Sequence, residues 1–163
     1  MGRDKAFLDF EGKPLWRRQL ETLKKLSPEQ LMISGPMREE WNEYEIVSDE
    51  IADAGPLAGV AATLRRSSAP SLVVLAVDLP WVTADFLRSL GPGAVPQGPS
   101  GFEPLAAVYP VTCLALALQL LQSTDFSMQN FARHAIDRGL LVTRAISPAE
   151  NRLFKNLNTP SDL

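Results

Sequence analysis

The segment Ser71–Val77 constrains the fold more than any other part of the chain. It reads Ser-Leu-Val-Val-Leu-Ala-Val, so six of its seven residues are apolar. A strand with apolar side chains on both faces is typical of a parallel sheet that helices cover on each side. We therefore expect this segment to be a central strand of such a sheet.

Asp78 follows this strand directly. In open α/β sheets, ligands bind outside the carboxyl ends of the strands, so a carboxylate at this position is a candidate metal or ligand contact. The alternative is an aspartate that begins a turn before Pro80. Taken alone, the position of Asp78 leaves both interpretations open.

Helices and short strands alternate along the rest of the chain. Helical spacing predicts helices over 14–26, 56–66, 83–90, 111–122 and 127–138, and short apolar runs predict strands at 31–34, 44–47, 105–109 and 140–145. The residues 91–101 include four glycines and three prolines, which predicts an irregular loop. This alternation predicts an α/β fold with a mostly parallel central sheet.

Length and charge narrow the class of protein. A chain of 163 residues is long enough for one substantial core, so we expect a single domain over 1–163. The formal net charge of -3 gives the phosphates of a nucleic acid no basic surface, and nucleic-acid binding is not expected. The longest uncharged stretch contains Pro110, which argues against a membrane span.

The charged start of the chain and the single Cys113, which cannot form an internal disulfide, favour a cytoplasmic protein.

Other segments carry candidate ligand-binding residues. Between Asp53 and Gly59, two glycines and a proline surround a helix start, where free N–H groups attract an anion or a nucleotide edge. A tight strand-to-helix connection would give the same pattern. Lys5 is a candidate phosphate ligand, with a solvated terminal lysine as the alternative. Asn156 and Asn158 alternate ahead of a helix cap, which would place both amides on one side of an extended segment.

In this order and at these intervals, the segments resemble the molybdenum cofactor guanylyltransferases, a family of the nucleotidyltransferase superfamily with a three-layer Rossmann-like fold. The matching segments are Asp4-Lys5-Ala6 continuing through Gly12-Lys13-Pro14-Leu15-Trp16, Asp53 with Gly55-Pro56-Leu57-Ala58-Gly59, Val77-Asp78-Leu79-Pro80, Glu103-Pro104-Leu105, and Asn156-Leu157-Asn158-Thr159-Pro160. Other nucleotidyltransferases share the lysine-glycine segment and the acidic residue. The Gly-Pro-Leu-Ala-Gly and Asn-x-Asn-Thr-Pro elements indicate the guanylyl branch.

The resemblance implies a reaction and a role for each matching residue. The family transfers GMP from GTP to molybdenum-molybdopterin, which gives molybdopterin guanine dinucleotide and pyrophosphate. By position, Asp78 would hold Mg²⁺ and Lys5 would pair with the triphosphate, so these two are the implied catalytic residues. Asp53 would accept hydrogen bonds from guanine. The implied nucleotide site also includes Gly55, Pro56, Leu57 and Gly59, and the implied molybdopterin site includes Asn156 and Asn158.

The resemblance leaves alternatives to guanylyl transfer open and implies further partner proteins. A cytidylyl- or sugar-nucleotide transferase of the same fold is one alternative, and a catalytically inactive nucleotide-binding homologue is another. Molybdoenzymes or cofactor-insertion proteins are candidate partners. Family members carry an apolar strand and a turn of the type Leu-x-Gly-Gly-x-Ser-x-Arg ahead of the segment that matches Met1–Lys5. Without that strand, we expect an open strand position in the sheet, filled by a partner chain or a rearranged segment, and weak transfer activity.

Overall fold

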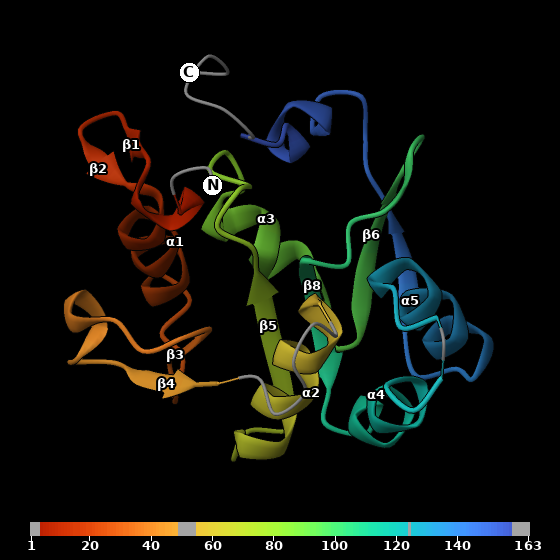
Figure 1. The fold of residues 1–163 in the computed structure, drawn as a ribbon. Coiled ribbons are helices and arrows are strands. Elements are labelled where there is room, and N and C mark those ends of the chain that lie inside the picture. The colour runs from red at the N-terminus through yellow and green to blue at the C-terminus, as the bar shows by residue number, and fades with distance from the viewer. Residues whose placement is uncertain (1–3, 49–54, 124, 158–163) are drawn as a thin grey trace.

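The computed structural model describes residues 4–48, 55–123 and 125–157 (Figure 1). The elements, in chain order, are η1 (Lys5–Phe7), β1 (Asp9–Phe10), β2 (Lys13–Pro14), α1 (Leu15–Lys24), β3 (Met32–Ser34), η2 (Glu39–Trp41), β4 (Glu45–Val47), α2 (Pro56–Arg66), β5 (Ser71–Leu75), α3 (Ala84–Ser89), β6 (Ala94–Gly98), β7 (Gly101–Phe102), β8 (Ala106–Pro110), α4 (Cys113–Leu120), α5 (Met128–Asp137), β9 (Val142–Ala145) and η3 (Asn151–Phe154). The elements that coincide with predicted helices and strands end within two residues of the predicted bounds.

Strands β5 and β8 lie between two layers of helices (Figure 1). Leu72 and Val74 of β5 pack toward the side that carries α2, α4 and α5. Val73 and Leu75, the alternate residues, pack with the buried side chains of α3 and with Leu23 of α1. Because successive side chains of a strand point to opposite faces, the apolar run gives each layer its own core.

The strand pairings differ from the expected, mostly parallel sheet. Among the described strands, β3 pairs with β4 and β6 pairs with β9 in parallel, whereas β5–β8, β6–β7 and β1–β2 are antiparallel. The α/β class therefore holds, and the predominance of parallel pairs is not confirmed. A strand that is apolar on both faces indicates that helices cover both sides of the sheet. The same pattern says nothing about the direction of the neighbouring strand, so it could not predict the antiparallel pairs.

The loop predicted over 91–101 is wrong, because it contains β6 and the start of β7. The carbonyl oxygens of Gly93, just before β6, and of Gln97, within β6, accept hydrogen bonds of 2.8 Å and 2.9 Å from backbone N–H groups on the β9 side. Pro96 lies between these positions, where its missing N–H interrupts no bond to β9. A proline-rich segment can therefore be a strand when each proline occupies the alternate register.

The helix starts follow local rules. Thr83 caps α3 as predicted, since its Oγ1 accepts a hydrogen bond of 3.2 Å from the N–H of Phe86. Helix α2 begins at Pro56 and ends at Arg66, in agreement with the predicted 56–66. No helix within the described part of the chain is long and apolar enough to cross a bilayer. The predicted cap at Thr159 lies outside the described residues.

Candidate active site

Lys5 and Asp78 meet just beyond the end of β5. Asp78 lies in the turn after this strand, and its Oδ2 is 3.7 Å from the Nζ of Lys5. The side chains are 29% and 42% exposed, so water and small solutes reach both. The predicted carboxylate and the predicted phosphate ligand therefore come together, although they belong to separate segments of the sequence.

The segment that carries Lys5 is anchored from several directions. Asp4 caps η1, because its Oδ1 accepts a hydrogen bond of 3.1 Å from the N–H of Ala6. Its other carboxylate oxygen pairs with Arg38 at 2.7 Å. The ring of Phe7, two residues after Lys5, stacks on Trp41 with a centroid separation of 5.9 Å. Lys5 is thus presented toward Asp78 by a short helix that is fixed on both sides.

Glu103 adds a second carboxylate to this site. Burial raises the pKa of its carboxyl group above the usual range, and the negative charge of Asp78 raises this pKa further. Its backbone is held by hydrogen bonds of 2.8 Å from its N–H to Pro96 and of 3.1 Å from the N–H of Ala106 to its carbonyl. The β5–β8 register places both residues at the same end of this strand pair, and a cation bound there would offset their like charges.

The position of Glu103 follows from strand direction. Because β8 runs antiparallel to β5 with Leu75 opposite Ala106, the residues before β8 lie beside the residues after β5. The sequence matched Glu103 to a family segment but gave it no role. Knowledge of the antiparallel register between β5 and β8 would have identified Glu103 as a neighbour of the residues after β5. Tyr109 supports this turn, since its buried hydroxyl donates a hydrogen bond of 2.6 Å to the carbonyl of Pro104.

The carboxyl-terminal segment also reaches the site. The N–H of Leu157 donates a hydrogen bond of 3.0 Å to the carbonyl of Asp78. The side chain of Leu157 is fully buried in a cluster with Leu8 and Leu15. This docking places the exposed Asn156 next to the turn that carries Asp78. Asn158 lies outside the described residues.

The start of α2 supplies the candidate nucleotide-binding backbone. Gly55 precedes the helix with φ of +62°, a conformation that favours glycine, and a Cβ placed there would meet nothing within 4 Å. Gly55 and Pro56 are exposed, whereas Leu57 is fully buried in the core and Gly59 is buried as well. Leu57 can therefore contribute only its backbone to a ligand. Asp53 lies outside the described residues.

These segments border one large groove. A cavity of about 770 Å³ lies between α1, β3, α2 and β5, and its lining includes Asp4, Gly55 and Val77. The residues next to Lys5, the start of α2 and the residue before Asp78 therefore face a common space. Of the residues predicted to bind the nucleotide, Gly55, Pro56 and Gly59 line this cavity, whereas Lys5, Leu57 and Asp78 are outside its lining and Asp53 lies outside the described residues.

A metal ion at this site would depend on few protein ligands. Across 4–48, 55–123 and 125–157, no group of three or more His, Cys, Asp or Glu side chains could hold a metal ion. Asp78 and Glu103 supply two carboxylates, which are hard oxygen ligands. Mg²⁺ commonly binds through one or two carboxylates together with substrate phosphates and water, and this donor set fits that pattern.

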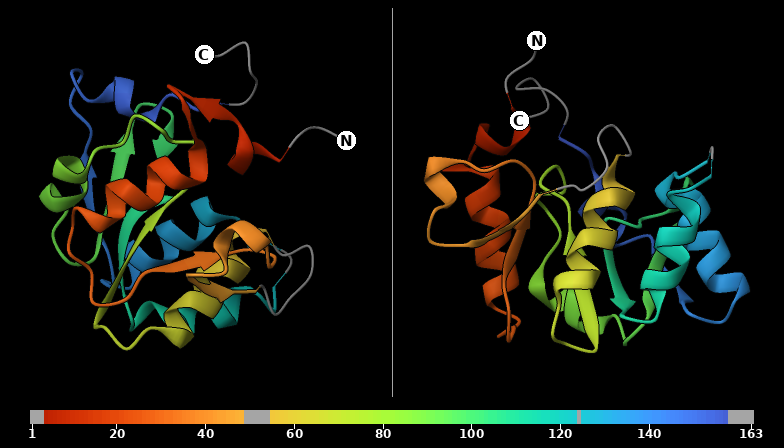
Figure 2. Two further views of the ribbon diagram at one scale, coloured as in Figure 1. Left: turned by 90° about the vertical axis from the view of Figure 1, so that its left-hand side faces the viewer. Right: turned by 60° about the horizontal axis from the view of Figure 1, so that its bottom comes forward.

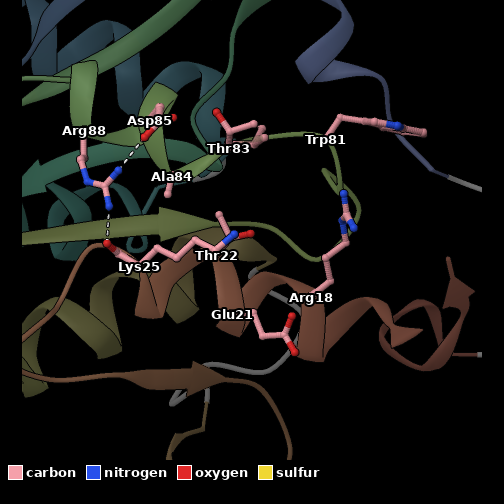
Figure 3. Close-up of a pocket in the computed structure, with 10 residues that line it drawn as sticks. Arg18, Glu21, Thr22, Lys25, Trp81, Thr83, Ala84, Asp85 and Arg88 are labelled. Carbon is pink, nitrogen blue, oxygen red and sulfur yellow. Dashed lines mark hydrogen bonds and ion pairs between the residues drawn. The ribbon is translucent and has the colours of Figure 1, made fainter. Parts of the chain in front are cut away.

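A second, smaller pocket of about 340 Å³ lies between α1 and the start of α3. In this pocket, Arg88 pairs with Asp85 at 2.6 Å and donates a hydrogen bond to the carbonyl of Lys25 (Figure 3). Arg18, also in this pocket, donates a hydrogen bond of 2.8 Å to the carbonyl of Pro80. These guanidinium groups connect neighbouring elements.

The single cysteine is not a nucleophile. Cys113 is fully buried, and burial raises the pKa of its thiol to about 11. The thiol therefore stays protonated at neutral pH. This agrees with the apolar run in which the sequence places it.

Comparison with known proteins identifies relatives along the whole chain. The model of the MobA-like NTP transferase domain matches residues 1–138. A protein of Opitutus terrae named "Probable molybdenum cofactor guanylyltransferase" is 37% identical over 99% of this chain and 86% of its own length. The molybdenum cofactor guanylyltransferase of Ectopseudomonas mendocina is 31% identical over 99% of this chain and 82% of its own length.

A solved structure gives the same result at the level of the fold. The chain superposes on the molybdopterin-guanine dinucleotide biosynthesis protein A of Archaeoglobus fulgidus with a TM-score of 0.75 and 25% identity. The match covers 97% of this chain and 86% of the archaeal chain. The similarity therefore extends over the segments that form the Lys5–Asp78 site.

Proposed function

The chain belongs to the MobA-like NTP transferase family, and from this premise we propose that it transfers GMP from GTP to molybdenum-molybdopterin, with release of pyrophosphate. The observation that carries the proposal is the approach of Lys5 to Asp78 at 3.7 Å just beyond the end of β5. The names of the relatives favour guanylyl transfer over the cytidylyl- or sugar-nucleotide alternative.

Nucleotidyltransferases typically use a divalent metal ion, and we assign Mg²⁺ to this site. Asp78 would hold the ion, and Glu103 would assist, because the β5–β8 register places both residues at the same end of these strands. When bound, Mg²⁺ supplies positive charge against the phosphate oxygens. Burial and, to a smaller extent, the charge of Asp78 raise the pKa of Glu103, and the same ion would favour its charged form.

Lys5 would act on the triphosphate. In the reaction, an oxygen of the terminal phosphate of molybdopterin attacks the α-phosphorus of GTP in line, and the bond from that phosphorus to the bridging oxygen of pyrophosphate breaks. Negative charge spreads over the transferred group, and a fixed ammonium lowers the energy of that state. The partly exposed Lys5 can turn from Asp78 to a phosphate oxygen while it stays in the site.

The start of α2 and Asp53 would select the base. Gly55 and Pro56 offer exposed backbone at a helix start, where a nucleotide can approach closely. A carboxylate at Asp53 matches the two adjacent N–H donors of guanine, which adenine does not present. Asp53 enters the proposal from the sequence, and the exposed start of α2 supports it.

Asn156 and Asn158 would face molybdopterin. The Leu157 hydrogen bond to the carbonyl of Asp78 supports this role for Asn156, because it fixes the segment beside the turn that carries Asp78. A recipient molybdoenzyme or insertion protein and a cytoplasmic location complete the proposal, and both rest on the sequence.

Pyrophosphate release tests the proposal. The purified chain is mixed with molybdenum-molybdopterin, Mg²⁺ and either GTP, CTP or ATP, and pyrophosphate and the dinucleotide product are measured. We expect release with GTP and formation of the guanine dinucleotide. Release with CTP instead would support the cytidylyl alternative. Saturable GTP binding without release would support the inactive homologue.

A further inference from the structure

Asp78 lies where β5 leaves its partner strand. The register of β5 with β8 ends at Leu75 and Ala106, and the N–H of Ala76 donates one more hydrogen bond, of 2.7 Å, to the carbonyl of Leu105. Beyond this bond, the described pairing with β8 no longer supports the backbone. The position of Asp78 therefore depends on what holds residues 76–80, which we call the Asp78 turn.

Helix α1 holds the Asp78 turn through Gln19. The amide nitrogen Nε2 of Gln19 donates hydrogen bonds to the carbonyls of Ala76 (2.7 Å) and Leu79 (2.9 Å), which lie on either side of Asp78 in the chain. Gln19 is only 4% exposed, so little water competes for these bonds. Figure 2 shows α1 running beside the loop that leads from β5 to α3. One buried side chain thus fixes the backbone before and after Asp78.

The preceding residue of α1, Arg18, holds the same turn one residue further along. Its Nε donates a hydrogen bond of 2.8 Å to the carbonyl of Pro80. The same guanidinium pairs with Glu11 at 2.9 Å and lies 4.7 Å from the ring centre of Phe10. Both of these residues follow the short helix that carries Lys5. Arg18 therefore connects the Asp78 turn to the segment after Lys5.

The start of α1 supports the other member of the ion pair. The N–H of Leu15, the first residue of α1, donates a hydrogen bond of 3.0 Å to the carbonyl of Leu8, which directly follows η1. The side chain of Leu15 is fully buried, which fixes this end of the helix in the core. A single helix therefore contacts both η1, which presents Lys5, and the turn that presents Asp78.

We propose that Gln19 and Arg18 are positioning residues, which fix the Asp78 carboxylate relative to Lys5 for the metal ion and the triphosphate. This inference rests on the proposed function, in which Asp78 holds Mg²⁺. Removal of a group that orients a metal ligand without touching the metal typically lowers activity or metal affinity by about 10- to 100-fold. Gln19 gives the turn two hydrogen bonds and Arg18 gives it one, so the larger effect is expected from Gln19.

Hydrogen exchange tests the positioning without nucleotide or metal. Gln19→Met keeps a side chain of similar size but removes both donors. The amide of Val82, which donates to the carbonyl of Leu79, should then exchange at least about tenfold faster. The amide of Val111, which donates to the carbonyl of Pro70 at the other end of β5, is the internal reference and should change less than about twofold. Equal acceleration at both amides would overturn the proposal, because it would indicate a general loss of stability.

The dependence of guanylyl transfer on Mg²⁺ gives the second test. Pyrophosphate release from GTP with molybdenum-molybdopterin is measured over a range of Mg²⁺ concentrations, well below the unfolding temperature of each variant. We expect Gln19→Met to raise the Mg²⁺ concentration for half-maximal release at least about tenfold. The KM for GTP at saturating Mg²⁺ should change less than about threefold, because the start of α2 is unaltered.

Leu20→Ala is the control for lost stability. It removes a side chain of the same helix that is 5% exposed, and this side chain gives the Asp78 turn no hydrogen bond. Leu20→Ala should lower the thermal unfolding temperature and leave the Mg²⁺ requirement within about twofold of the unmodified chain. If Gln19→Met and Leu20→Ala show the same Mg²⁺ requirement, Gln19 has no positioning role.

A matched pair of arginine variants provides the same tests if Gln19→Met does not fold. Arg18 and Arg88 line the smaller pocket in Figure 3, and each pairs with one carboxylate and donates to one backbone carbonyl. Only Arg18 has its acceptor in the Asp78 turn. Arg18→Met should raise both the Mg²⁺ requirement and the exchange rate of Val82 at least about threefold, and Arg88→Met should change each less than about twofold. Equal effects of the two variants would contradict the proposal.

The two kinds of measurement separate this inference from the proposed function. If the unmodified chain releases no pyrophosphate from GTP, the proposed function is wrong, and the exchange rate of Val82 alone decides whether α1 positions the Asp78 turn. If the unmodified chain is active and Gln19→Met has the same Mg²⁺ requirement and the same exchange rate, the proposed function stands and the positioning role is wrong.

Discussion

Lys5 Nζ lies 3.7 Å from Asp78 Oδ2, and this contact joins the start of the chain to the end of β5. Both side chains are partly exposed, so the ion pair itself adds little to stability. In the proposed function its role is chemical, since it would hold a cation and a carboxylate beside the nucleoside triphosphate and the metal ion. The predictions below separate this chemical role from structural support.

Replacement of Lys5 should impair the reaction more than the fold. Lys5→Met removes the ammonium but keeps much of the apolar stem, and we expect guanylyl transfer to fall by about 10²-fold, as for other fixed groups that stabilise a transition-state charge. Lys25→Met removes a lysine that borders the other pocket and serves as the control. Steady-state rates and thermal unfolding of both variants give the comparison. A rate for Lys5→Met within twofold of the unmodified chain would remove Lys5 from the mechanism.

Glu103 should make stability depend on pH. Its pKa is raised in the folded state by burial and by Asp78, so the folded protein holds this proton to a higher pH than the unfolded chain. The stability that Glu103 contributes is present below the ordinary glutamate pKa, and it is lost as the pH rises through the raised value. Glu103→Gln should therefore gain stability relative to the unmodified chain as the pH rises above about 4, where an ordinary glutamate begins to ionise.

Chemical unfolding at several pH values measures this effect. The expected result is a difference between Glu103→Gln and the unmodified chain that grows with pH. Added Mg²⁺ should reduce the difference, because the ion would stabilise the charged carboxylates. A pH-independent difference would show that folding does not raise the pKa of Glu103.

Gly55 should be needed for its backbone conformation. At φ of +62°, any residue with a Cβ is strained, and Gly55→Ala should lower the free energy of unfolding by about 1 kcal/mol or more. Gly91→Ala is the matched control. A Cβ at Gly91 would also meet nothing within 4 Å, but the φ of Gly91 does not lie in the positive range that strains other residues. Denaturant titration compares the two. If both variants lose equal stability, the conformation at Gly55 is not the cause.

Leu157 should fix the carboxyl-terminal segment on the core. Its side chain is fully buried, and Leu157→Ala should cost about 2–5 kcal/mol of stability, the usual range for a buried leucine. Val142→Ala, at a side chain that is 63% exposed, should change stability by less than about 0.5 kcal/mol. Hydrogen exchange at residue 157 would show whether the segment detaches locally. Unchanged exchange and stability would contradict the docking that places Asn156.

The sequence predicted local structure well where one rule dominated. The α2 helix follows from apolar spacing between Pro56 and Arg66, and the start of α3 follows from the Thr83 cap. Such features depend on residues that are neighbours in the chain. They could be read without knowledge of the tertiary fold.

Features that depend on strand neighbours were not predictable in the same way. The apolar run of β5 indicated burial on both faces but did not reveal that β8 is antiparallel. The same missing register concealed that Glu103 and Asp78 lie at the same end of the β5–β8 pair, and it concealed the pairing of β6 with β9. The groove beside β5 brings Gln19 of α1 and Trp41 of η2 together with β5, and this lining required the structure.

The Asp78→Ala variant tests whether the Asp78 carboxylate is needed for guanylyl transfer. Pyrophosphate release from GTP is measured with molybdenum-molybdopterin and Mg²⁺ for the unmodified chain, Asp78→Ala and the control Asp85→Ala, whose carboxylate is 91% exposed and pairs with Arg88. The account predicts that Asp78→Ala loses at least about 10²-fold in rate while its thermal unfolding is nearly unchanged, and that Asp85→Ala retains full activity. A folded Asp78→Ala protein that releases pyrophosphate at the unmodified rate would contradict the account.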